Sequence, residues 1–132
     1  MNISTYFLFA LFFNPAILQP KDCSFLTVEK IKFGIDRVMA ESFHDTIPVM
    51  HITIVNRCKK CEVKGPDYCP LIVLNENNDT IASSAINGVP RKYKASRTYQ
   101  VTARNKEKWV QPDVSKIKIQ LLPYCKDLPV KL

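Results

Sequence analysis

The pattern of hydrophobic and polar positions is clearest over residues 47–58, the most apolar run outside the N-terminus. Ile52 and Ile54 share one parity, and His51 and Thr53 share the other, as in a strand that lays one face on a core. β-branched residues dominate the run, and its proline stands near the start, where strands tolerate one. The run leads directly into a cluster of cysteines. It therefore predicts the core strand of a small β domain held by disulfides.

The same two-residue alternation recurs along the chain, with turn residues in between. It predicts further strands over residues 30–35, 70–74, 80–86, 98–103 and 115–121. Residues 75–79 and 87–90 are rich in Asn, Asp, Gly or Pro, which predicts turns. Two of these strands should each bury one face, formed by Tyr99, Val101 and Ala103 in one and by Ile117, Ile119 and Leu121 in the other.

Three segments are less regular. Gly34 is a candidate position for a β-bulge. Residues 36–44 fit either one turn of helix or a loop, and residues 105–113 fit a charged loop whose Trp109 either caps the core or contacts a partner. Six or seven short strands with at most one turn of helix predict an all-β fold, a small antiparallel β-sandwich with disulfides.

The N-terminus has the composition of a secretory signal peptide. Residues 1–20 carry no charge, and the apolar run over residues 3–13 ends at Asn14 and Pro15. We expect a signal peptide over residues 1–19 and a single secreted domain over residues 20–132. Because a membrane span needs about 20 apolar residues, no stable span is expected, and an uncleaved signal anchor is the alternative.

The cysteines favour an oxidising, extracellular compartment. All five follow the apolar N-terminus, and they are the disulfide candidates Cys23, Cys58, Cys61, Cys69 and Cys125. Such cysteines are expected to pair, and an odd count leaves one thiol over or available to another chain. A redox C-x-x-C site, and a zinc site completed by His44 or His51, are the alternatives. We expect no metal and no cofactor.

Positive charge is concentrated in one part of the chain. The formal net charge is +7, and residues 91–108 hold seven basic residues against Glu107, which gives +6. Such a field suits an acidic partner, a receptor ectodomain at the cell surface or an acidic wall or matrix polymer, while a solvated loop pair is the alternative. No nucleic-acid partner is expected.

The basic residues fall into two clusters on either side of the strand predicted over residues 98–103. That strand spans ~23 Å, well beyond the Debye length of ~8 Å in physiological salt, so the clusters should act separately. The first cluster is the predicted partner-binding site because Arg and Tyr often dominate interfaces. Its residues are Arg91, Lys92, Tyr93, Lys94 and Arg97, and the second cluster is Arg104, Lys106 and Lys108.

No set of catalytic residues stands out, so the chain is expected not to be an enzyme. A small, basic, secreted hydrolase or nuclease is the alternative, and it would need His44 and His51, which are the chain's two histidines, for acid and base work. Asn78-Asp79-Thr80 is an N-glycosylation sequon within a predicted turn. Asn78 is therefore the expected glycosylation site.

The order of these motifs resembles the tapetum-determinant family of small, secreted, cysteine-rich plant proteins. The motifs are Cys23-Ser24, the strand from Pro48 to Asn56-Arg57-Cys58, then Cys61 and Cys69, the turn Asn87-Gly88-Val89-Pro90, Tyr99, and Cys125. The resemblance implies a β-sandwich and, for the best-known member, a ligand of a leucine-rich-repeat receptor kinase. The chain departs from the family at Ala85, where a cysteine is expected, and at Pro70-Leu71, which replaces Trp-Phe.

Overall fold

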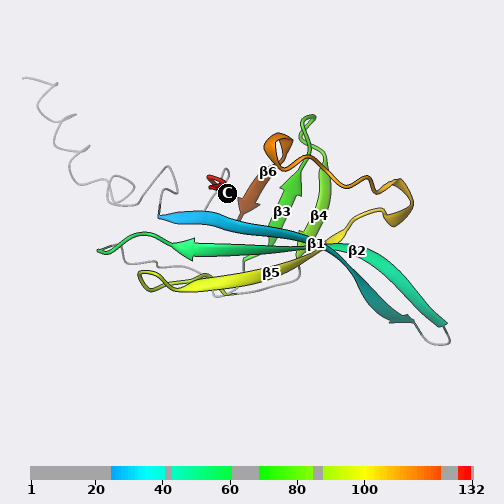
Figure 1. The fold of residues 1–132 in the computed structure, drawn as a ribbon, viewed down its shortest axis with the longest axis horizontal. Coiled ribbons are helices and arrows are strands. Elements are labelled where there is room, and N and C mark those ends of the chain that lie inside the picture. The colour runs from blue at the N-terminus through cyan, green and yellow to red at the C-terminus, as the bar shows by residue number, and fades with distance from the viewer. Residues whose placement is uncertain (1–24, 41–42, 61–68, 85–87, 123–127, 132) are drawn as a thin grey trace, which may run out of the picture.

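The computed structural model describes residues 25–40, 43–60, 69–84, 88–122 and 128–131. Six antiparallel strands form one curled sheet in the order β1-β2-β5-β4-β3-β6 (Figure 1). The strands are β1 (Leu26–Ala40), β2 (Phe43–Asn56), β3 (Leu71–Leu74), β4 (Thr80–Ser84), β5 (Ser96–Ala103) and β6 (Lys118–Leu121). Two single-turn 3-10 helices, η2 (Lys106–Lys108) and η3 (Val114–Lys116), lie between β5 and β6. The predicted all-β class is confirmed.

The alternation of apolar residues identified the buried faces correctly. Ile52 and Ile54 of β2 are fully buried, while His51 and Thr53 are half-buried. Every residue predicted to face inward on the strands over residues 98–103 and 115–121 is buried as well: Tyr99, Val101, Ala103, Ile117, Ile119 and Leu121. All of these side chains except Ala103 share one hydrophobic core with residues of all six strands. A period of two therefore located the core.

The assignment of residues 36–44 to a helical turn or loop was wrong. Residues 36–40 continue β1 and residues 43–44 begin β2, paired in register from Asp36↔Ile47 to Ala40↔Phe43. Cross-strand hydrogen bonds decide this conformation, and the nine residues 36–44 contain only the first two residues of the partner strand. A long β-hairpin takes the place of the predicted break.

Gly34 is not a bulge. It pairs in regular register with Val49, and the irregularity in β1 falls between Val28 and Lys30. A Cβ built on Gly34 would lie 3.7 Å from a methyl group of Val49, which is ordinary van der Waals contact. Glycine was a misleading signal here because a classic bulge accepts any residue near the right-handed region.

The C-terminal segment joins the two edges of the sheet. The amide of Leu128 donates to the carbonyl of Ile119 in β6 over 2.8 Å. The amide of Val28 in β1 donates to the carbonyl of Pro129 over 3.0 Å, and its carbonyl accepts from the amide of Lys131 over 2.9 Å. Residues 128–131 thus bridge β6 and β1. The described strands form this one curled sheet, and the predicted division into two packed sheets is not seen among them.

One end of the sheet extends into a two-stranded arm, which we define as residues 35–40 and 43–48. The pairing of β2 with β5 ends at Val49↔Thr102, so the hairpin beyond that point has no third strand beside it in the sheet. Figure 1 shows the arm bending away from the other strands. No helix within the described part of the chain is long and apolar enough to cross a membrane.

Candidate functional site

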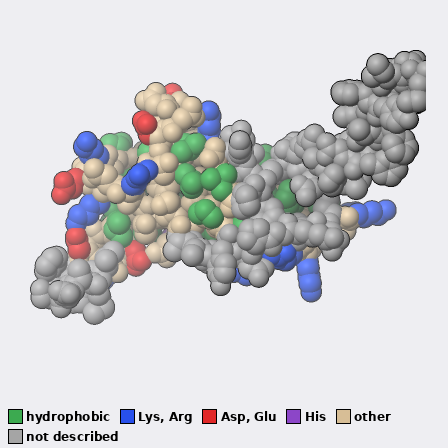
Figure 2. Space-filling view, turned by 180° about the vertical axis from the view of Figure 1, so that it is seen from behind, with side chains coloured by type: hydrophobic (Ala, Val, Ile, Leu, Met, Phe, Trp, Pro, Cys, Tyr) green, Lys and Arg blue, Asp and Glu red, His purple; other side chains and the backbone are tan. Residues whose placement is uncertain are grey.

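The end of the sheet where β2 stops and β5 starts collects basic side chains. Because the two strands are antiparallel, with Val55 opposite Ser96, the segment after β2 lies beside the segment before β5. We call this surface the basic end, and its residues are Arg57, Lys59, Lys60, Arg91, Lys92, Lys94 and Arg97. All seven are exposed. Figure 2 shows Lys and Arg projecting on its right-hand side, whereas acidic and basic side chains mix on the left.

The four predicted basic residues of the partner-binding site lie in this surface, with Tyr93 between them in the chain, and the structure adds three residues that sequence reasoning missed. Arg57, Lys59 and Lys60 come about 35 residues before the predicted cluster, so they did not count toward it. The sequence did predict both strands involved, over residues 47–58 and 98–103. If these two strands had been paired antiparallel, the residues after the first strand would have been placed beside the residues before the second.

Asn56 holds the loops of the basic end in place from inside the protein. Its side chain is fully buried, donates through Nδ2 to the carbonyl of Pro90 over 2.9 Å, and accepts from the amide of Cys58 over 2.8 Å. Its backbone amide donates to the carbonyl of Ala95, and its carbonyl accepts from the amide of Lys94. One buried residue therefore fixes both segments that carry the positive charge.

A tight turn presents the central basic residues. The amide of Ala95 donates to the carbonyl of Lys92 over 2.9 Å, and Lys94 adopts a left-handed backbone with φ of 66°. A positive φ is uncommon outside glycine and is maintained only where the surroundings require it. The hydrogen bond from the amide of Lys94 to the carbonyl of the buried Asn56 holds the backbone in this conformation. The turn is therefore held in a defined shape.

Tyr93 lies between two of the ammonium groups. The Nζ atoms of Lys94 and Lys59 lie 5.4 Å and 5.6 Å from the centre of its ring, within the range of a cation–π interaction. Tyr93 as a whole residue remains 40% exposed. Arg57 is paired with Glu29 of β1 instead. The surface thus offers an aromatic face flanked by cations.

Tyr99 anchors the other side of the same loop. Its ring is fully buried in the core, and its hydroxyl donates to the carbonyl of Gly88 over 2.8 Å. Burial raises the pKa of Tyr99 to about 12, with a further raising contribution from Cys69 and an opposing one from Arg97. The residue stays neutral and acts as a structural donor.

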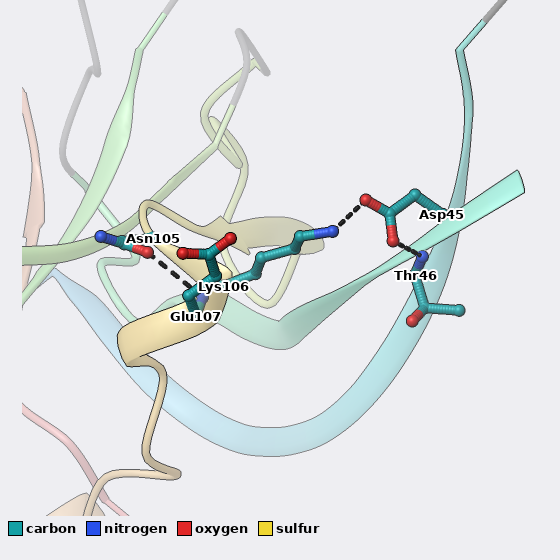
Figure 3. Close-up of polar contacts among 5 residues, drawn as sticks. All are labelled: Asp45, Thr46, Asn105, Lys106 and Glu107. Carbon is teal, nitrogen blue, oxygen red and sulfur yellow. Dashed lines mark hydrogen bonds and ion pairs between the residues drawn. The ribbon is translucent and has the colours of Figure 1, made fainter. Parts of the chain in front are cut away.

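The second predicted cluster lies at the opposite end of β5. Asn105 caps η2 by accepting from the amides of Glu107 and Lys108, and Lys106 in that turn pairs with Asp45 of the arm (Figure 3). The hydrogen bond from Lys106 lowers the pKa of Asp45, with a smaller contribution from the amide of Thr46. Lys106 is therefore occupied in joining the arm to the body of the protein.

A groove of about 520 Å³ opens beside this second cluster, next to Trp109. Its two carboxylates already serve the chain itself. Glu76 lies 3.9 Å from Nζ of Lys116, and Asp113 accepts from the amide and hydroxyl of Ser115 at the start of η3. Trp109 is half-buried and packs against the core. This position corresponds to the core-capping role, one of the two roles predicted for it.

The remaining candidates are spread over the molecule. Asn78 is exposed in the β3–β4 turn with φ of 63°, and its side-chain oxygen accepts from Lys118. Cys69 is buried in the core and Cys58 is half-buried, while Cys23, Cys61 and Cys125 lie outside the described residues. His44 and His51 stand seven positions apart on β2. Within the described residues, no three His, Cys, Asp or Glu side chains gather as metal ligands.

Comparisons with protein-family models, with curated proteins and with solved structures found no match for this chain.

Proposed function

We propose that this protein is a secreted, non-enzymatic β domain that binds an acidic partner through its basic end. The partner is an acidic surface of a receptor ectodomain or an acidic polymer of the wall or matrix. One observation carries the proposal: the buried Asn56 fixes the two segments that meet at the basic end, where seven basic side chains are exposed and the ammonium groups of Lys59 and Lys94 lie near the ring of Tyr93. A surface ordered before binding loses less conformational entropy when its partner arrives.

The resemblance to the tapetum-determinant family supports the same region. Its two most specific motifs are the strand end Asn56-Arg57-Cys58 and the turn that ends at Pro90. The hydrogen bond from Asn56 to the carbonyl of Pro90 joins them directly. On this proposal the motif residues build the scaffold of a binding surface, and the chain is a plant extracellular ligand. We also propose that the domain contains disulfides and that the curled sheet closes on itself as a small β-sandwich.

The sequon at Asn78 fits this arrangement. The β3–β4 turn lies beyond Ala103, since Ala82 pairs with Ala103 and Ser84 with Val101. The basic end lies beyond the opposite end of β5, at Ser96. A glycan on Asn78 would therefore leave the basic end uncovered.

A hydrolase or nuclease has less support. His44 and His51 are separated by seven positions along one strand, or ~23 Å at about 3.3 Å per residue. A general acid and a general base must both reach one reacting group. Activity on bulk RNA that disappears when both histidines are replaced by alanine would nevertheless favour this alternative.

The test is binding of the secreted protein to immobilised polygalacturonate and to intact plant protoplasts, measured over a range of salt concentrations. Replacing Arg91, Lys92 and Lys94 by Ser should weaken binding about tenfold or more and flatten its salt dependence. Replacing Lys59 and Lys60 by Ser should also weaken it, because they border the same turn.

The matched control replaces Arg104, Lys106 and Lys108 by Ser, which removes the same charge from the opposite end of β5. It should weaken binding less than threefold at physiological salt, since the Debye length there is ~8 Å. Equal losses from the two triple variants would show a nonspecific field and would overturn the assignment to the basic end. Binding to protoplasts but not to polygalacturonate would select the receptor as the partner.

A further inference from the structure

Within the described residues, the outer edge of β1 is open from Glu29 onward. β1 is the first strand of the sheet, with β2 on its inner side. In the part of the chain that the structure describes, the C-terminal segment covers the outer side of β1 only at Val28. There the amide and carbonyl of Val28 form hydrogen bonds with the backbone of Pro129 and Lys131. Among the described residues no further backbone bond reaches that edge. An open edge carries unpaired amides and carbonyls that can accept another strand.

The register shows which residues offer those groups. In an antiparallel ladder, hydrogen-bonded pairs alternate with non-hydrogen-bonded pairs. The amides and carbonyls of the non-hydrogen-bonded residues point away from the partner strand. Val28 bonds outward, to the C-terminal segment, and the bulge before Lys30 shifts the alternation by one residue. Ile31, Phe33 and Ile35 therefore present their backbone groups on the open edge, followed by Arg37.

The sequence of this edge is complementary to itself when read in the opposite direction. Residues 29–37 read Glu-Lys-Ile-Lys-Phe-Gly-Ile-Asp-Arg. If a second copy lies antiparallel with Phe33 opposite its own equivalent, Glu29 meets Arg37, Lys30 meets Asp36, Ile31 meets Ile35 and Lys32 meets Gly34. Every charged residue then faces either an opposite charge or a glycine.

The side chains favour the same register. Ile31 and Phe33 pack partly against the core, and Ile35, which follows them on the same face, is 74% exposed. In the paired arrangement the three apolar residues of each copy form one continuous row, which would cover Ile35. Cross-strand pairs of this kind stabilise a sheet.

We propose that two copies of this chain associate through their β1 edges, antiparallel and centred on Phe33, to form a continuous sheet across a two-fold axis. The hydrogen-bonded pairs are Phe33 with Phe33 and Ile31 with Ile35. The backbone amides and carbonyls of these residues all point to the open edge. A two-fold interface needs a self-complementary surface, and residues 29–37 supply one. Residues 35–37 of this edge already belong to the arm, which bends away from the other strands (Figure 1).

The lysines of β1 select this register among others. Lysine on an edge strand normally discourages pairing, and centring on Ile31 would place Lys30 opposite Lys32 of the other copy. Within one copy, Lys32 already lowers the pKa of Lys30. Centring on Phe33 places Lys30 opposite Asp36, whose carboxylate also accepts from Nε2 of Gln100 within its own copy, and places Lys32 opposite Gly34. The charges therefore favour one alignment.

The experiment is sedimentation velocity of the secreted chain from about 1 µM to about 1 mM, in wild type and charge variants. The wild type should pass from monomer to dimer as concentration rises. Lys30→Asp and Asp36→Lys should each weaken the dimer about tenfold, because each places like charges opposite one another at two symmetric positions. The double variant Lys30→Asp/Asp36→Lys should restore the wild-type dimer.

Two controls keep the result specific. Lys108→Asp makes the same charge change in η2, outside β1, and should leave the dimer unchanged. A non-reducing gel separates a covalent dimer through the odd cysteine from the sheet dimer. A wild type that stays monomeric throughout would overturn the proposal, as would a dimer that tolerates both single changes. A double variant that fails to restore the dimer would overturn the register.

Discussion

The two ends of β5 carry similar sequences and differ in how the fold uses them. Arg91, Lys92 and Lys94 precede the strand, and Arg104, Lys106 and Lys108 follow it. At the first end, the backbone of the charged loop is held by the buried Asn56 and Tyr99. At the second end, a lysine side chain itself forms the contact, with Asp45 of the arm.

The difference shows that the position of a charge in the sequence does not reveal its role. Where backbone atoms and a buried amide organise a loop, the cations remain on the surface and can face a partner. Where the cation organises the loop, its charge is already matched within the protein. The basic end is therefore the better candidate for binding, although both clusters have three basic residues within five positions.

The largest expected effect comes from removing the buried anchor of the basic end. Asn56→Ala leaves the carbonyl of Pro90 and the amide of Cys58 without their partner, and the free energy of unfolding should fall by roughly 2–4 kcal/mol. Binding to polygalacturonate should weaken as well, although no charge is lost. Chemical denaturation and the binding assay measure the two effects.

The matched control is Asn75→Ala. The side chain of Asn75 also makes two bonds, from the amides of Asn77 and Asp79, but it does so in the exposed β3–β4 turn. Water can replace those bonds, so the loss should be about 1 kcal/mol or less. If both substitutions destabilise equally, burial of Asn56 is not what distinguishes the basic end.

An intermediate effect is expected from Tyr99, and it depends on pH. The pKa of Tyr99 is raised from 10.0 to about 12, so the folded protein keeps its proton where the unfolded chain loses it. The free energy of unfolding should therefore be fully retained below pH 10 and fall by about 2 kcal/mol or less as pH rises toward 12. Tyr99→Phe should remove this part of the pH dependence.

Denaturation of the wild type and Tyr99→Phe at several pH values isolates that contribution, because the other groups titrate in both. Tyr93→Phe removes the hydroxyl of an exposed ring and is the matched control. At neutral pH, Tyr99→Phe should cost about 1 kcal/mol for the lost bond to Gly88. Parallel curves for the wild type and Tyr99→Phe would contradict the buried-donor role.

The smallest effect is expected at the arm. Lys106→Met removes the contact with Asp45 and should speed amide hydrogen exchange in the arm a few-fold while leaving the melting temperature unchanged, because exposed ion pairs add little stability. The pKa of Asp45 is lowered, so in the wild type the contact should persist above about pH 4 and be lost as pH falls below it. Lys108→Met, in the same turn, should not change the exchange. An arm that exchanges equally fast with Lys106 present would show that the contact does not restrain it.

Much of the fold could be read from local sequence. The β2 and β5 strands and their buried faces followed from alternation, since a strand on a core repeats every two residues. The β3–β4 turn followed from its Asn and Asp residues, which accept local amide bonds as Asn75 does. The arm did not follow, because the conformation of residues 36–44 depends on a partner strand.

The sequence by itself determined the all-β class, the buried faces and the local concentration of charge. Only the tertiary structure decided that Arg57, Lys59 and Lys60 join the basic end, that Asn56 lies beneath it, and that the C-terminal segment joins β6 to β1. The physical reason is the range of the interactions. Side-chain periodicity is set by neighbouring residues, whereas the pairing of β2 with β5 and the bond from Asn56 to Pro90 join residues more than thirty positions apart.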